Sequence, residues 1–543
     1  MPRLFIPILF LTLASNSPRS DAESKPTPPI HTLPPLYAPA LAVVALDQRM
    51  TFTKLPPSKK MPALCHFQYR VATASPECQA FVDQSLGFYY SYVFMEAARS
   101  AETAIRHDPD CAYAWFSLSR SLEKWGKADS TKALERAKEL MPKASQREQL
   151  LIQSKLQEKG MWPGVGPDER KKKAAASLDE LLTLYGEDEE GWFARAQLNG
   201  GTEGVVYYKA LLHINPIHPG ASHELVHFYE NYKRPALGWP FAEAYIASSP
   251  GIPHAFHMQS HLAMRIGKWE KTTDWSTHAV ELEKAYHRAM DVKPGDDAQF
   301  DHHLETLTRS LIHDGRLAEA KALKYEHDKS SSKRGEWPVL WFRLYRTGCE
   351  WEEAQKIVAE TRKGNKGLAS YYASVMALDR GDTKSAAAEI DVLRQEQQRK
   401  KADRDLEQRL WEVQGRLMCQ QGSGEPGLKL MQRAVDKTKD NFAAHAWGHG
   451  AYFMEQWGIG ALEAGNAVVA EEAFLEALAH DSGSVYGALG MRAICERQGR
   501  SEEAKNFGLV AERCWHKADR PIYEMLKEEM MKKASTHSFE SRR

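Results

Sequence analysis

Two pairs of histidines in this sequence have a spacing that suits the binding of a metal ion. His223 and His227 are four residues apart, and so are His257 and His261. Because residues at i and i+4 share one face of an α-helix, each pair would present two imidazoles side by side. The second pair begins thirty-four residues after the first. We therefore expect four imidazoles at equivalent places on neighbouring helices, where they could share a transition metal.

Each histidine pair has one further potential ligand on the same helix face. Glu230 follows the first pair and His254 precedes the second, in each case at a spacing of three residues. Packed helix axes lie roughly 8–10 Å apart, so one metal ion at about 2.0–2.1 Å from each nitrogen can join the two helices. His302 and Glu305, on a following unit, are expected to complete the site or to support its ligands. The predicted metal ligands are His223, His227, Glu230, His254, His257, His261, His302 and Glu305.

The donor set also predicts the kind of metal and leaves two alternatives open. Nitrogen-rich ligation with a carboxylate favours zinc, copper, iron or nickel over calcium or magnesium, and zinc is the cofactor we expect. A hydrogen-bonded seam of histidine and glutamate without metal is one alternative. A second possible cluster, His445 and His449, is interpreted as packing between aromatic neighbours.

The other alternative is a zinc-dependent hydrolase or peptidase. The string His-Glu-Leu-Val-His at 223–227 matches the His-Glu-x-x-His motif, in which the glutamate, here Glu224, is the general base. On a helix, however, Glu224 is turned about 100° from His223. The equivalent position after His257 holds no glutamate. The repeated pattern therefore favours a shared metal site over a protease helix.

The thirty-four-residue period is that of the tetratricopeptide repeat (TPR), a helix–turn–helix unit that stacks into a solenoid. Near the C-terminus, Gly458, Ala470, Phe474 and Ala477 fall at positions eight, twenty, twenty-four and twenty-seven of one repeat. The pattern is helical nearly everywhere from Ser75 onward. The sequence therefore predicts an all-α fold, a TPR-like solenoid that coils as a right-handed superhelix.

Several segments resemble a bacterial family of exported TPR proteins. The run SPECQAFVDQSLGFYY, followed by DPDCAYA, is similar to the opening repeat of that family. SHELVHFYE is similar to its His-x-x-x-His-x-x-Glu motif, and HAFHMQSHLAMRIGKW to its His-x-x-His-Met-x-x-His motif. In DHHLETL, His302 matches the first histidine of a third family motif and Glu305 replaces the second. The resemblance covers residues 75–325 best and implies a helical solenoid and export, but no defined activity; the position of Glu224 varies in the family.

The composition along the chain predicts its organisation. Arg3 followed by an apolar run predicts a signal peptide over residues 1–22, and hence export to the bacterial periplasm or cell surface. A Pro-rich linker or lead-in over 23–74 follows, with a possible short strand over 49–54. Two TPR-like arrays, 75–325 and 326–530, precede a disordered tail at 531–543. No segment after the signal is apolar for long enough to cross a membrane.

Charge and cysteine content limit the choice of partner. The 543 residues include 72 basic and 72 acidic ones, which argues against nucleic acid as a partner. Seven cysteines without close pairs are not a disulfide framework, and a bridge between Cys65 and Cys78 stays open. We therefore predict an exported scaffold whose concave face binds a protein or peptide beside the histidine-rich patch.

Overall fold

The described part of the chain consists of helices throughout. The computed structural model describes residues 49–126, 130–232, 234–329, 337–400, 402–440 and 451–535. Within these ranges there are 25 α-helices and three 3-10 helices, and no β-strand. The predicted strand over 49–54 is wrong, because these residues form a turn in which the Lys54 amide donates to the Met50 carbonyl. The predicted signal peptide lies outside the described residues.

The helices of the first part of the chain are α1 (Pro76–Tyr90), α2 (Phe94–His107), α3 (Ala112–Trp125), α4 (Ser130–Leu140), α5 (Gln146–Glu158), α6 (Arg170–Leu184), α7 (Glu189–Asn199) and α8 (Gly201–Ile214). The middle of the chain forms α9 (Pro219–Asn231), α10 (Pro235–Ser248), α11 (Pro253–Arg265), α12 (Trp269–Met290), α13 (Phe300–His313) and α14 (Leu317–Lys329). Three 3-10 helices, Met141–Lys143, Pro167–Glu169 and Pro294–Asp296, lie in connections.

The last part contains α15 (Trp337–Thr347), α16 (Trp351–Gly364), α17 (Lys366–Asp379), α18 (Thr383–Arg399), α19 (Arg404–Gln420), α20 (Gly424–Asp440), α22 (Tyr452–Glu463), α23 (Ala467–His480), α24 (Val485–Arg497), α25 (Ser501–Cys514) and α26 (Arg520–Ser535). Helix α26 thus extends five residues into the predicted tail. Among the described residues, consecutive helices pack against each other from α1 to α25, and α26 packs on α24 and α22, which is the arrangement of a TPR-like helical-repeat protein.

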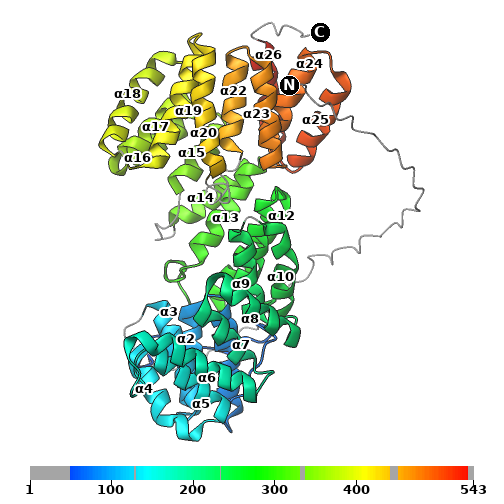
Figure 1. The fold of residues 1–543 in the computed structure, drawn as a ribbon. Helices are drawn as coiled ribbons and strands as arrows, with labels where there is room; N and C mark the ends of the chain where they lie inside the picture. The colour runs from blue at the N-terminus through cyan, green and yellow to red at the C-terminus, as the bar shows by residue number, and fades with distance from the viewer. Residues whose placement is uncertain are drawn as a thin grey trace, which may run out of the picture.

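The repeats form two bodies joined through the middle of the chain (Figure 1). Helices α1–α8 lie in one body and α15–α26 in the other, with α12–α14 between them. Trp269 of α12 and His313 of α13 both contact Asp481 after α23, with Trp269 Nε1 to Asp481 Oδ1 at 3.0 Å and His313 Nε2 to Asp481 Oδ2 at 2.9 Å. The two bodies therefore meet through buried polar contacts as well as through the chain connection.

Small residues let the helices of one repeat approach closely, as the sequence predicts. Ala470, Phe474 and Ala477 have no exposed surface. A Cβ atom added at Gly458 would lie 2.5 Å from the Phe474 ring, and the same holds at Gly490 of the next unit. The large ring therefore fills the space that the two glycines leave, which fits the repeat template.

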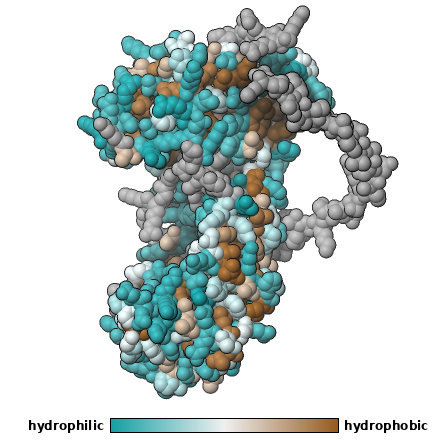
Figure 2. Space-filling view, viewed as in Figure 1, coloured by the Kyte–Doolittle hydropathy of each residue, from teal (hydrophilic) through white to brown (hydrophobic). Residues whose placement is uncertain are grey.

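Hydrophobic side chains are packed between the helices rather than exposed. The buried apolar residues form four clusters that follow one another along the repeats. The face seen in Figure 2 is mainly hydrophilic, with hydrophobic side chains in separate small groups. Among the described residues, none of the helices is long and apolar enough to cross a membrane.

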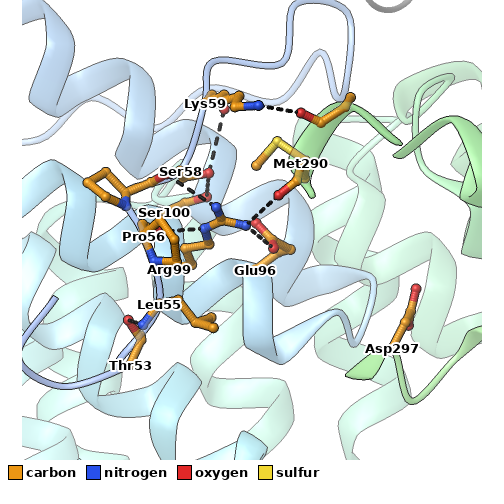
Figure 3. Close-up of polar contacts among 12 residues, drawn as sticks. Thr53, Leu55, Pro56, Ser58, Lys59, Glu96, Arg99, Ser100, Met290 and Asp297 are labelled. Carbon is orange, nitrogen blue, oxygen red and sulfur yellow. Dashed lines mark hydrogen bonds and ion pairs between the residues drawn. The ribbon is translucent and has the colours of Figure 1, made fainter. Parts of the chain in front are cut away.

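The described part of the Pro-rich lead-in lies against the helices. Arg99 of α2 donates from Nε to the Pro56 carbonyl at 2.8 Å and from Nη1 to the Met290 carbonyl at 3.4 Å (Figure 3). Lys59 Nζ donates to the Ala289 carbonyl at 2.7 Å. Glu96, fully buried, pairs with Arg99 at 3.1 Å. Residues predicted to be a linker therefore connect the N-terminal hairpin to the end of α12.

All seven cysteines are free thiols, and Cys65 and Cys78 form no disulfide bond with each other.

Candidate metal centre

Three helices position the histidines. Helices α9 and α11 both begin at a proline, and Pro219 and Pro253 are thirty-four residues apart. Proline is favoured at a first helical position because its missing N–H has no partner to lose there. His218 caps α9 by accepting from the Ala221 amide at Nδ1, 3.1 Å away. Because each histidine pair lies at the same distance from the start of its helix, the two pairs lie at equivalent positions on α9 and α11. Helix α13 lies beside α11.

The structure brings seven imidazoles together in a continuous cluster. Three groups have ligand atoms that all lie within 4.8 Å of one another: His223, His227 and His254; His254, His257 and His303; and His257, His261 and His302. The groups share His254 and His257, so the cluster runs without a break from α9 through α11 to α13. Three nitrogen ligands within this distance satisfy the basic requirement of a transition-metal site.

A connection from the distant N-terminal hairpin covers the cluster. Tyr92, between α1 and α2, stacks on His227 with a ring separation of 5.7 Å and an interplanar angle of 10°. Its backbone has a φ of 59°, a left-handed conformation that is uncommon for a bulky residue. The predicted patch on an open concave face is therefore a largely buried centre in which His227, with 29% of its side chain exposed, is among the most accessible members.

Protein oxygens outside the cluster lie beside Nδ1 of four rings. His223 Nδ1 lies 2.6 Å from the Tyr90 carbonyl oxygen, which can only accept a hydrogen bond. Glu230 lies 3.1 Å from Nδ1 of His261 and 3.5 Å from Nδ1 of His227. Glu283 of α12 contacts Nδ1 of His303. When Nδ1 donates outward, the lone pair of Nε2 is directed into the cluster, which is the usual support for a metal-bound histidine.

Glu230 carries the main negative charge beside the cluster. Burial alone would raise the pKa of Glu230, but His261, His227 and Arg265 outweigh burial and hold it well below the usual range. Arg265 donates to Glu230 Oε1 from Nε at 2.9 Å and from Nη2 at 2.8 Å. Arg265 therefore pairs with this buried acid, and the carboxylate stays ionised.

Five of the imidazoles are held in the neutral form. Burial, reinforced by neighbouring histidines, lowers the pKa of His223, His254 and His257 well below the ordinary value. It lowers the pKa of His303 to about 3 and that of His302 to about 2. Neutral imidazole is the form that binds metal, so burial prepares these side chains as ligands.

His257 is the most unusual member of the cluster. Its side chain has no exposed surface, and neither ring nitrogen has a hydrogen-bond partner among the described residues. A buried polar group without a partner costs free energy of about 1–3 kcal/mol. A cation bound by one nitrogen would satisfy the lone pair of that nitrogen.

Three of the predicted site residues, Glu224, Glu230 and Glu305, lie outside the three groups. Glu224 accepts from the Tyr92 hydroxyl and from Gln197 Nε2, both at 2.8 Å. Glu305 pairs with Arg309 at 2.9 Å, one turn further along α13. The second predicted cluster, His445 and His449, lies outside the described residues. The other predicted histidines all belong to the cluster, and Glu230 supports two of them.

Sequence reasoning missed three residues that shape the centre. His303 was passed over in favour of its neighbour His302, although the adjacent pair was itself a signal. Glu283 and Tyr92 come from segments with no local pattern that points to this site, and only the fold brings them there.

Comparisons with known proteins identify neither a family nor a function for this chain. No protein-family model matches the sequence, and no curated protein matches it significantly. A human IFIT1 dimer with m7Gppp-AAAA is 13% identical with a TM-score of 0.28, and the alignment covers 81% of this chain and 90% of that chain. A human IFIT1 dimer with PPP-AAAA is 11% identical with a TM-score of 0.26, covering 80% and 94%. Similarity this low carries no argument about ligands.

Proposed function

We propose that this protein is an exported helical-repeat scaffold that binds a transition-metal ion, with zinc or copper best suited, in the buried histidine cluster. The observation that carries the proposal is His257, whose two buried nitrogens face other imidazoles and have no protein partner among the described residues. Buried polar groups in native proteins are nearly always satisfied, so a cation between the rings accounts for the arrangement.

The outer carboxylates support the same proposal. Glu230 lies 3.1 Å from Nδ1 of His261 and places negative charge close to the proposed cation, and Glu283 contacts Nδ1 of His303. A metal-free seam of histidine and glutamate would use such acceptors too, but it would not leave both nitrogens of a fully buried ring without a partner. Metal binding explains both features.

Metal analysis of the purified protein tests the proposal. We expect bound or stoichiometrically reloadable zinc in the wild-type protein and its loss in the double variant His223→Ala with His257→Ala. His213→Ala is the matched control, because His213 is exposed on α8 and lies outside the three groups. A wild-type protein that cannot be loaded with zinc or copper would refute the proposal.

A metal-dependent hydrolase is the second candidate function. It is favoured by the first group, in which His254 adds a third imidazole to the His-Glu-x-x-His pair. The proposed base, Glu224, would have to leave the Tyr92 hydroxyl and the Gln197 amide to reach a metal-bound water. Glu224→Gln should abolish turnover and retain the metal if this function is present; hydrolysis of peptides at an unchanged rate would exclude the base.

The scaffold part of the proposal rests on the second half of the chain. A cavity there is lined by side chains from α12, α13, α15, α22 and α24, including Arg343 and Tyr452, and by Trp515 after α25. Cationic and aromatic side chains in a helical-repeat groove suit a peptide with acidic and apolar residues. Pull-down from periplasmic or surface extract, compared between wild type and Arg343→Ala, would show whether a partner uses this cavity.

A further inference from the structure

The arrangement of His254 points to more than a single metal ion. Its two ring nitrogens face two different imidazoles: Nε2 lies 3.0 Å from Nε2 of His223, and Nδ1 lies 3.2 Å from Nε2 of His303. Two nitrogens bound tetrahedrally to one metal at about 2.0–2.1 Å are about 3.3 Å apart. Both separations are close to that value, so each side of the ring has the spacing of a shared metal ion.

We propose that the cluster binds two transition-metal ions that share His254 as a bridging ligand. One ion is held by His223, His227 and His254, and the other by His254, His257 and His303. This inference rests on the proposed metal-binding function and specifies its stoichiometry. Each nitrogen of His254 gives its lone pair to one ion, and the ring proton is released to solvent as the second ion binds.

The proton positions along this line explain why a second cation fits. The Tyr90 carbonyl requires a proton on Nδ1 of His223, which leaves a lone pair on Nε2 facing His254. If Glu283 is ionised, it likewise places the proton of His303 on Nδ1 and leaves a lone pair facing His254. A neutral His254 has one N–H for these two lone pairs, so one contact is left without a proton. A metal ion on each side removes the conflict.

Without metal, the same line closes when Glu283 at its far end is protonated, the form that burial favours by raising the pKa of Glu283. If Glu283 is protonated, it donates to His303, which donates to His254, which donates to His223. The same imidazoles can therefore either bind two metal ions bridged by His254 or form a metal-free chain of hydrogen bonds. They differ in the number of cations bound, which can be measured directly.

Each proposed ion has one histidine that is backed by a carboxylate. His227 lies 3.5 Å from Glu230, and His303 contacts Glu283. Buried charge is costly unless opposite charge lies nearby, so the ionised Glu230 and the deprotonated bridge between the ions reduce the cost of holding two cations at close range.

Loading with copper(II) tests the bridge, because two copper ions joined by one imidazolate are magnetically coupled. We expect two copper ions per chain and loss of the ordinary mononuclear electron paramagnetic resonance signal in the full-length protein. His303→Gln should reduce the content to one copper with a full mononuclear signal. His302→Gln is the matched control, since His302 belongs only to the third group, and it should keep two coupled ions.

The other outcomes separate this inference from the proposed function. Two uncoupled copper signals would place the ions in the first and third groups, which share no residue, and would overturn the bridge. One copper per chain in the wild type would also overturn it while leaving metal binding intact. No bound copper, with no bound zinc, would overturn both. Circular dichroism of each variant confirms that the compared proteins are folded.

Discussion

The two halves of the molecule each bury a polar network, but one network pairs opposite charges and the other brings like side chains together. In the second half, Arg416 donates to Asp379 at 2.6 Å and to Glu463 at 2.8 Å. Arg346 also pairs with Asp379 at 2.6 Å. In the histidine cluster, by contrast, imidazole nitrogens face each other. The arginine network pairs opposite charges within the protein, whereas we propose that the histidine cluster is completed by added cations.

Breaking the arginine network should produce the largest effect on folding. Arg416 is 2% exposed, and Arg416→Met leaves Asp379 and Glu463 buried with less compensating charge. Removing one partner of a buried pair costs about 3–5 kcal/mol, and we expect that loss in urea unfolding. Arg492→Met, which removes a partly exposed pair with Glu496, should cost less than about 1 kcal/mol. Equal losses of unfolding free energy for the two variants would show that the buried network contributes no more to stability than a partly exposed ion pair.

Adding metal should affect only the histidine cluster. A ligand that binds the folded protein at one hundred times its dissociation constant stabilises it by about 2.7 kcal/mol. Zinc should therefore raise the thermal midpoint of the wild type and of His213→Ala, but not that of His223→Ala with His257→Ala. Differential scanning calorimetry measures the change. A zinc-induced rise that survives in the double variant would place the binding elsewhere.

Removing the outer carboxylate should weaken metal binding without removing a ligand. Glu230→Gln replaces the charge that faces His227 and His261, and loss of such support typically lowers metal affinity about 10–100-fold. Competition with a chromophoric chelator measures the affinity. Glu224→Gln, on the same helix but outside the three groups, is the control and should bind zinc as the wild type does. Equal affinities for both variants would contradict the role given to Glu230.

Two histidines outside the metal groups should give the two halves opposite responses to pH. Burial lowers the pKa of His218 to about 3, so its contribution to stability is present above pH 6.5 and is lost as the pH falls below that value. We expect the wild type to lose about 1 kcal/mol relative to His218→Asn between pH 7 and 5.5. Asparagine retains the helix cap. Parallel pH profiles of urea unfolding would refute this assignment.

His313 should behave in the reverse way. Burial alone would lower its pKa, but Asp481 outweighs burial and raises it above 6.5. The contribution of the charged pair is therefore complete below pH 6.5 and is lost as the pH rises through the raised value. Relative to His313→Asn, the wild type should become less stable from pH 6.5 upward. A difference that does not change with pH would show that the contact acts only by packing.

The sequence predicted the fold because the contacts within each repeat join residues that are close in the chain and recur at a fixed spacing. The spacing of Gly458 to Phe474 describes a contact within one hairpin, and the equal spacing of the histidine pairs places α9 beside α11. Tyr92 and Glu283 could not be predicted, since they reach the cluster through contacts between segments far apart in the chain. Glu305 was chosen by resemblance to a motif, and its pairing with Arg309 depends on packing that no motif records.

X-ray absorption at the zinc edge tests the central claim most directly. For the zinc-loaded wild type, we predict a first shell dominated by nitrogen at about 2.0–2.1 Å, with the outer-shell scattering of at least three imidazoles. A first shell with sulfur at about 2.3 Å, or with oxygen and no imidazole scattering, would contradict the account.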